Sequence, residues 1–324
     1  MPESSSSLSP ALPGQLADLP QLAQFAMASM SIGRQHLAMA QLSDALKNRG
    51  AEDVFISHVQ AASRTVAAAV ATRIAADAAM LVGCDQETSQ PGTKALVACL
   101  EGLHQQIAEA GIRFVQACWD VDGETPPFAA AGYEAIARLD YLSARMPAEP
   151  VAEATLAGES RQTPDAPSPA EDRLVVCPID PRQADQQRRM TKIVTETFVG
   201  TQDCPALNRY RTPSDIVAAY LESPAFDPSG WSILQWQQQD VACVITTPYV
   251  EARTLELTYM GVVPGQRGRG WGRQLIDEAF RIARRLRCEE LMLAVDQANT
   301  PARHVYHQAG FQTIASEAVW GRVP

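Results

Sequence analysis

The sequence contains neither a long hydrophobic run nor an excess of basic residues, and both absences exclude classes of function. Its 324 residues include 27 lysines and arginines against 37 aspartates and glutamates, so the formal net charge is −10. A chain with this balance repels nucleic acid and anionic membranes. No segment approaches the roughly 20 apolar residues that span a bilayer, and the N-terminus lacks a signal-peptide pattern. We therefore expect a cytoplasmic protein that binds neither nucleic acid nor membrane.

Cysteine pairs at metal-binding spacing are also missing. The seven cysteines are widely scattered, and no two of them form a Cys-x-x-Cys pair. This spacing argues against a zinc site and against a disulfide framework. We expect reduced, mostly buried thiols and no metal cofactor.

Two segments stand out by their composition and divide the chain, and large apolar residues are few in the second of them. Residues 1–20 are rich in Ser and Pro, which predicts disorder, and residues 148–172 are rich in Pro, Ala and Glu, which predicts a linker. The remaining segments, 21–147 and 173–324, are each long enough to bury a core. We therefore expect two domains.

The second half shows an orderly series of predicted elements. Strand patterns cover residues 174–179, 231–236, 241–249, 254–263 and 291–295, and helical patterns cover 183–198, 213–221 and 272–286. Thr212 is a candidate N-cap for the second helix. A strand, a loop, a helix and a further strand at the end of this series predict a mixed sheet with a central βαβ unit.

The two halves share an internal repeat. AGYEAIA at residues 131–137 and AGFQTIA at residues 309–315 are identical at four of seven positions, with an offset of 178. Carried upstream without a gap, this offset pairs Gly83 with Gly261 and Gly92 with Gly270. We infer two copies of one fold.

The segment GVVPGQRGRGWGRQL, residues 261–275, combines glycine and arginine between a strand and a helix. Free N–H groups at such a point can bind an anion, and glycines allow a ligand to approach the main chain. The glycines and arginines concerned are Gly268, Gly270, Gly272, Arg267, Arg269 and Arg273. A Walker A loop would have Lys and Ser or Thr after Gly272, and a dinucleotide motif would have a third glycine at position 273. The segment therefore predicts a pyrophosphate site of another kind.

These residues resemble the GNAT superfamily of acyl-CoA-dependent N-acyltransferases. Its signature Q/R-x-x-G-x-G/A is matched by Arg267, Gly270 and Gly272, and its second signature is matched by Asn299, Ala302, Tyr306 and Gly310-Phe311. The resemblance covers most of residues 174–323. It implies an α/β (α+β) fold with two tandem GNAT-like domains, each with a mixed, largely antiparallel central sheet and flanking helices.

The resemblance also implies a function, that of an N-acetyltransferase of the EC 2.3.1 class. The enzyme would move an acetyl group from acetyl-CoA to a primary amine of a small molecule, peptide or protein, by direct attack in a ternary complex. Tyr306 matches the family's general acid, and Glu256 stands where one branch carries its general base. The implied acetyl-CoA-binding residues are Met260, Val262, Val263, Gln266, Arg267, Gly268, Arg269, Gly270, Trp271, Gly272 and Asn299.

Each candidate also has a structural interpretation. Tyr306 fits a half-buried helix aromatic, Glu256 fits a solvated or ion-paired residue, and Asn299 fits the end of a strand. His304 and His307 are expected at the surface. A non-catalytic acyl-CoA-binding or sensor module stays an alternative to the enzyme.

The first copy has lost the residues of the site. At the offset of 178, Glu256 falls on Ala78 and Tyr306 on Phe128, whereas Gly270 falls on another glycine. We predict a degenerate first domain and one active site per chain. The two copies would form an internal pseudo-dimer in a monomer, unless the chain forms a homodimer.

Overall fold

The computed structural model describes residues 8–88, 93–121, 125–146 and 174–324. The chain forms two compact units, and neither is a single continuous segment. Unit 1 comprises Met1–Arg138, Ala206–Asp215 and Glu317–Pro324, and unit 2 comprises Leu139–Pro205 and Ile216–Ser316. The predicted linker, 148–172, lies outside the described residues. No helix in the described ranges is long and apolar enough to cross a membrane.

Unit 1 is built on a mixed sheet with the strand order β1-β2-β3-β4-β5-β12. The strands β4 and β5 are parallel, and the other neighbours are antiparallel. The strands are β1 (Leu12–Pro13), β2 (Val54–Ala61), β3 (Arg64–Ala75), β4 (Ala78–Gln86), β5 (Phe114–Asp120) and the end of β12 (Gln312–Arg322). The helices are α1 (Leu19–Ala26), α2 (Ile32–Asn48) and α3 (Lys94–Glu109).

Unit 2 repeats this design in the order β6-β11-β10-β9-β8-β7, with β10 and β11 as the parallel pair. Its strands are most of β6 (Glu134–Arg145), β7 (Val175–Pro178), β8 (Trp231–Trp236), β9 (Gln239–Tyr249), β10 (Thr254–Val262) and β11 (Glu290–Asp296). Its helices are α4 (Ala184–Phe198), most of α5 (Pro213–Glu222), α6 (Trp271–Arg285) and α7 (Thr300–Gln308). The α+β class and the mixed, largely antiparallel sheets predicted from the sequence are confirmed.

The last strand of each repeat completes the sheet of the other unit. Residues 139–145 of β6 pair with β11 in unit 2, and residues 317–322 of β12 pair with β5 in unit 1. The two units therefore do not correspond to the two parts of the chain that lie before and after residues 147–173. An amphipathic strand pattern determines which face is buried but not which edge the strand joins, so this exchange leaves no mark in the sequence.

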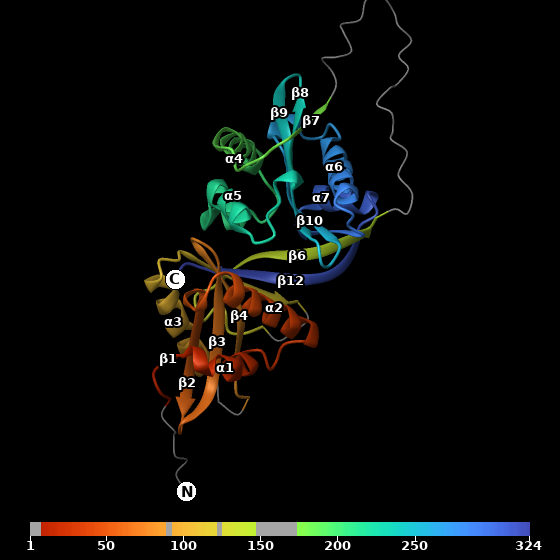
Figure 1. The fold of residues 1–324 in the computed structure, drawn as a ribbon. Helices are drawn as coiled ribbons and strands as arrows, with labels where there is room; N and C mark the ends of the chain where they lie inside the picture. The colour runs from red at the N-terminus through yellow and green to blue at the C-terminus, as the bar shows by residue number, and fades with distance from the viewer. Residues whose placement is uncertain (1–7, 89–92, 122–124, 147–173) are drawn as a thin grey trace, which may run out of the picture. The chain divides into compact units, whose positions relative to one another are not determined.

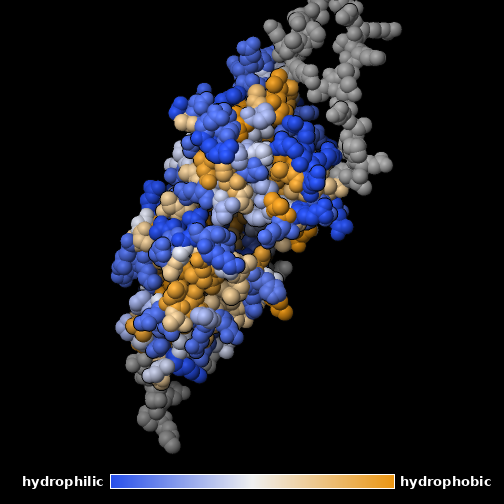
Figure 2. Space-filling view, viewed as in Figure 1, coloured by the Kyte–Doolittle hydropathy of each residue, from blue (hydrophilic) through white to orange (hydrophobic). Residues whose placement is uncertain are grey.

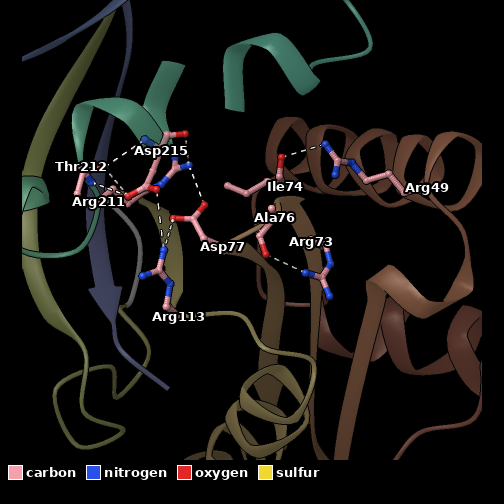
Figure 3. Close-up of polar contacts among 9 residues, drawn as sticks. All are labelled: Arg49, Arg73, Ile74, Ala76, Asp77, Arg113, Arg211, Thr212 and Asp215. Atoms are coloured by element: carbon pink, nitrogen blue, oxygen red, sulfur yellow. Dashed lines mark hydrogen bonds and ion pairs between the residues drawn. The ribbon is translucent and has the colours of Figure 1, made fainter. Parts of the chain in front are cut away.

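Two further segments of unit 1 differ from the expectations. Residues 12–20, expected to be disordered, contain β1 and the start of α1, and Leu12 is paired with His58 of β2. Residues 206–215 join unit 1 through ion pairs that Figure 3 shows around Asp77. Arg211 donates to Asp77 at 3.1 Å, and Arg113 lies 3.9 Å from both Asp77 and Asp215.

In unit 2 the sheet is covered on both faces, with α4 and α5 on one side and α6 and α7 on the other (Figure 1). One apolar cluster includes Leu255, Leu275 and Tyr306, and a second includes Met190, Trp231 and Ile245. Figure 2 shows one face of the protein, on which hydrophilic residues predominate and hydrophobic residues form separate patches. All seven cysteines are free thiols, and five of them are buried, as the sequence predicted.

Candidate functional site

The central strands of unit 2 separate part-way along their length. β10 pairs with β11 only over Thr254–Glu256, whereas it continues to pair with β9 as far as Val262. The register with β9 shifts between Leu257 and Tyr259, which marks a β-bulge at Thr258. Among the described residues, the last part of β10 therefore has no partner strand on its β11 side. This is the open edge that the sequence assigned to residues 260–263.

The loop after β10 leads into α6 through two glycines in the left-handed region. Gly268 has φ of 78° and Gly270, the N-cap of α6, has φ of 82°. No protein acceptor is found among the described residues for the backbone N–H groups of the five residues from Gly268 to Gly272. These amides lie at the positive end of the α6 dipole and form a site for an anion. Gly272 itself lies within α6, and its φ is not positive.

Arg267 anchors the loop. Its guanidinium donates to the carbonyl oxygens of Thr197 at 2.8 Å, Val199 at 2.9 Å, Gly200 at 3.0 Å and Val262 at 3.0 Å. Three of these carbonyls belong to the end of α4 and the residues that follow it, where helix carbonyls lack intrahelical partners. The side chain thus joins α4 to the end of β10, a use that differs from the phosphate contact expected of it.

The other two arginines of the loop are exposed. Arg269 lies over the ring of Trp236, with its Cζ 4.8 Å from the ring centroid, and Arg273 pairs with Asp277 at 3.0 Å one turn along α6. Weak surface interactions of this kind leave both cations available to an anion at the helix N-terminus.

Two buried polar atoms beside the free amides have no partner. They are Gln266 Oε1, two residues before the run of unpaired N–H groups, and Trp271 Nε1, within that run. A buried donor or acceptor without a partner is costly, so its presence in a loop indicates a ligand or water contact. The loop therefore fits a ligand with both anionic and donor groups, as the pyrophosphate and pantetheine parts of acetyl-CoA require.

Glu256 stands on β10 just before the strands separate. The Tyr249 hydroxyl donates to its Oε2 at 3.0 Å. The side chain is half-buried, and burial raises the pKa of Glu256 above its ordinary value, while the hydrogen bond from Tyr249 lowers it. A carboxylate with a raised pKa is a stronger base than an ordinary one.

Tyr306 is almost fully buried on α7, at 6% exposure, and its hydroxyl has no hydrogen-bond partner among the described residues. Burial raises the pKa of Tyr306 well above its ordinary value, and the charge of Asp203 adds to the shift. The phenol therefore keeps its proton and can donate it. Asn299 caps α7 by accepting from the Ala302 N–H at 3.3 Å, so it begins this helix as well as following β11.

Comparison with known proteins identifies this half of the molecule. The acetyltransferase (GNAT) family matches residues 200–311, a range that contains the open edge, the glycine loop and α7. These residues are similar to the GNAT family. A mycothiol acetyltransferase from Beutenbergia cavernae is 38% identical over 71 residues, which is 22% of this chain and 24% of that protein. The chain therefore matches about a quarter of the length of that relative.

Solved structures show the same fold beyond the GNAT segment. A GCN5-related N-acetyltransferase from Sphaerobacter thermophilus is similar with a TM-score of 0.59 and 17% identity, over 98% of this chain and 95% of that one. A GCN5-related glucosamine N-acetyltransferase region of a fungal multi-domain β-N-acetylglucosaminidase gives a TM-score of 0.61 and 11% identity, over 98% of this chain and 38% of that one. At these identities the likeness concerns the fold alone.

Unit 1 has the same strand geometry as the GNAT domain but different side chains. Its β4 has a bulge at Val82, and Ala78 pairs with Phe114 as Thr254 pairs with Glu290. This register corresponds to an offset of 176 between the two repeats. The constant offset of 178 is therefore wrong for the strands that precede residues 131–137 and 309–315. The cause is a connection between β5 and β6 two residues shorter than that between β11 and β12. Glu256 then corresponds to Met80 rather than Ala78, and neither can serve as a base.

The sequence interpretation missed Asp203 as a member of the site. Its Oδ1 accepts from the Asp296 N–H at 3.0 Å. No motif marks Asp203, because it follows α4 and reaches the site only through the fold. His304 and His307 are exposed, as expected for surface residues.

Proposed function

We propose that the protein is an N-acetyltransferase that transfers the acetyl group of acetyl-CoA to a primary amine at one site in unit 2. The observation that carries this proposal is the run of unpaired amides from Gly268 to Gly272, placed directly beyond the open edge of β10. A pyrophosphate at the amides and a pantetheine arm along the edge satisfy both sets of backbone groups. The GNAT match over the same residues supports it.

The binding residues divide by the part of acetyl-CoA that they contact. Main-chain groups of Met260 and the N–H of Val262 pair with the pantetheine arm, and a backbone N–H there polarises the thioester carbonyl. Val263, expected to join them, instead donates its N–H to the Val241 carbonyl at 3.0 Å and accepts from the Gln266 N–H at 2.9 Å. Gln266 and the residues of the loop hold the pyrophosphate, with the Arg267 side chain keeping the loop on α4. Arg269, Trp271 and Asn299 complete the site at its edges.

The transfer requires one proton to leave the amine and one to reach the sulfur. The amine nitrogen attacks the thioester carbon, and Glu256 takes the nitrogen's proton through a water molecule. When the carbon–sulfur bond breaks, Tyr306 donates its phenolic proton to the departing thiolate. The raised pKa of each group supports its assigned role, since it makes Glu256 a stronger base and keeps Tyr306 protonated.

The acceptor is a small-molecule amine or an amine of a peptide or protein. The similarity to mycothiol acetyltransferase favours a narrower candidate, in which this chain uses the acceptor of that enzyme. The assay is release of CoA from acetyl-CoA with a panel of polyamines, amino acids, aminosugars and peptide N-termini. CoA release with at least one amine, abolished by Tyr306→Phe, supports the enzyme. Tight acetyl-CoA binding with no release across the panel would favour the sensor module.

A further inference from the structure

Asp203 is held in place by a reciprocal pair of backbone contacts at the end of β11. Its Oδ1 accepts from the Asp296 N–H at 3.0 Å, and the N–H of the next residue, Cys204, donates to Asp296 Oδ2 at 3.1 Å. Cys204 adopts a left-handed φ of 43°, which a non-glycine residue accepts only where its surroundings require it. The loop after α4 is therefore fixed to β11, and the carboxylate of Asp203 has a defined position.

This position is at the N-terminal end of α7, toward which Tyr306 points. The N–H of Asn299, the N-cap of α7, donates to the carbonyl of Asp296 at 2.8 Å, so the start of α7 lies beside the residue that Asp203 contacts. Tyr306 lies seven residues after Asn299, on the same face of the helix, and helical side chains lean toward the helix N-terminus. The Tyr306 hydroxyl, which has no partner in the described ranges, is thus aimed at the region of Asp203. The influence of the Asp203 charge on the Tyr306 pKa agrees with this placement.

The carboxylate of Asp203 is not neutralised by a protein cation. Its side chain is exposed, and within the described residues no lysine, arginine or histidine forms an ion pair with it. The neighbouring Asp296 adds to the negative charge beside the Asp203 carboxylate. An accessible carboxylate that is fixed and uncompensated attracts a cation of the ligand.

We propose that Asp203 binds the cationic nitrogen of the acceptor beside Tyr306, so that the site selects aliphatic ammonium acceptors over neutral arylamines. This inference rests on the proposed function, because it assigns the acceptor side of the same site. Asp203 and Glu256 act differently. Asp203 holds the ammonium group, whereas Glu256 passes one of its protons to solvent to give the neutral amine that attacks the thioester, and then takes the second proton as the amide forms. The unpaired hydroxyl of Tyr306 and the fixed, uncompensated Asp203 are the two observations behind the proposal.

The test compares benzylamine, which is cationic near neutral pH, with aniline, which is neutral. Each is titrated by calorimetry into the full chain loaded with CoA, so no turnover is required. Asp203→Asn keeps an oxygen that can accept from Asp296 but removes the charge. We expect it to raise the Kd of benzylamine by about tenfold and to leave aniline binding within about twofold of wild type. Asp203→Glu retains the charge and should retain the preference for benzylamine.

Asp185→Asn is the matched control, since it removes one exposed negative charge at the far end of α4, about 20 Å away along the helix. It should leave both Kd values unchanged. Equal effects of Asp203→Asn on both amines, no effect on either, or a wild-type protein that does not bind benzylamine would overturn the proposal. Melting temperatures of all variants show whether each is folded. Failure of wild-type turnover with acetyl-CoA would instead contradict the proposed function and leave the calorimetric result valid.

Discussion

The Arg267 guanidinium donates to the Thr197 carbonyl at 2.8 Å, and this contact joins two segments 70 residues apart. With three further carbonyls, it makes one side chain responsible for holding the glycine loop against the end of α4. The loop can therefore present its amides in a fixed arrangement before any ligand arrives, which lowers the entropic cost of binding.

Arg267→Ala should lower both stability and affinity for acetyl-CoA. Hydrogen bonds from a charged group contribute about 1.5–3 kcal/mol, and the variant loses them together with the order of the loop. Thermal denaturation and calorimetric titration with acetyl-CoA measure the two effects. Arg273→Ala is the control for the loss of stability alone, because its exposed pair with Asp277 contributes only about 0.3–0.5 kcal/mol. Equal losses of stability in the two variants would show that Arg267 has no special anchoring role.

Gly270→Ala should weaken acetyl-CoA binding through the backbone alone. A Cβ added at Gly270 meets nothing within 4 Å, so the cost is the left-handed φ of 82°, about 1–2 kcal/mol. Relief of that strain would turn the unpaired amides away from the anion. Gly265→Ala is matched, since its Cβ also meets nothing within 4 Å and its φ is not positive. The acetyl-CoA Kd should rise only for Gly270→Ala. A similar Kd for both variants would contradict the binding of the pyrophosphate by the unpaired amides.

Tyr249→Phe should move the pH dependence of the reaction. The hydrogen bond from Tyr249 lowers the pKa of Glu256, against the larger opposite effect of burial. Its removal raises that pKa further, so the acidic limb of the kcat/KM profile shifts to higher pH. Glu256→Gln should reduce kcat by roughly 10²–10⁴-fold at all pH values. An acidic limb that does not move in Tyr249→Phe would indicate a different base.

A buried histidine in unit 1 should make the protein sensitive to acid. His104 is 2% exposed and bonded to the Tyr133 hydroxyl at 2.8 Å, and burial, aided by the charge of Arg322, lowers its pKa to about 3. The unfolded chain binds a proton near pH 6.5 and the folded chain does not, so stability is lost as pH falls from about 6.5 toward 3, by about 1.4 kcal/mol per unit.

His104→Gln should flatten this dependence, because glutamine can bond Tyr133 but does not titrate. The exposed His36→Gln variant should keep the wild-type slope. Urea denaturation at a series of pH values measures the free energy of unfolding for each protein. If the slope were the same in all three proteins, another group would be responsible for the acid sensitivity.

The sequence predicted the features that depend on local chemistry. Gly268 and Gly270 have the positive φ values that glycine allows, and the Thr212 hydroxyl accepts from the Asp215 N–H at 3.2 Å at the start of α5. The strands and helices predicted between residues 174 and 295 begin and end within two residues of their predicted bounds. Helical and strand periodicity, together with capping, were sufficient for these elements.

Contacts between distant segments could not be predicted in this way. Arg267 contacts carbonyls at the end of α4, and Asp203, which follows α4, contacts Asp296. Both contacts depend on where α4 ends in three dimensions. The exchange of β6 and β12 depends on which sheet edge is available to each strand. The two-residue error in the repeat arose because ungapped comparison cannot detect loops of different length.

Titration of the full chain with acetyl-CoA by calorimetry addresses both the existence and the number of sites. Unit 2 has the unpaired amides and the GNAT residues, and unit 1 has the same strand geometry without the site's acid and base. We predict one equivalent of acetyl-CoA bound per chain, with binding weakened by Gly270→Ala. Two equivalents, or no binding, would contradict a single acetyl-CoA site in unit 2.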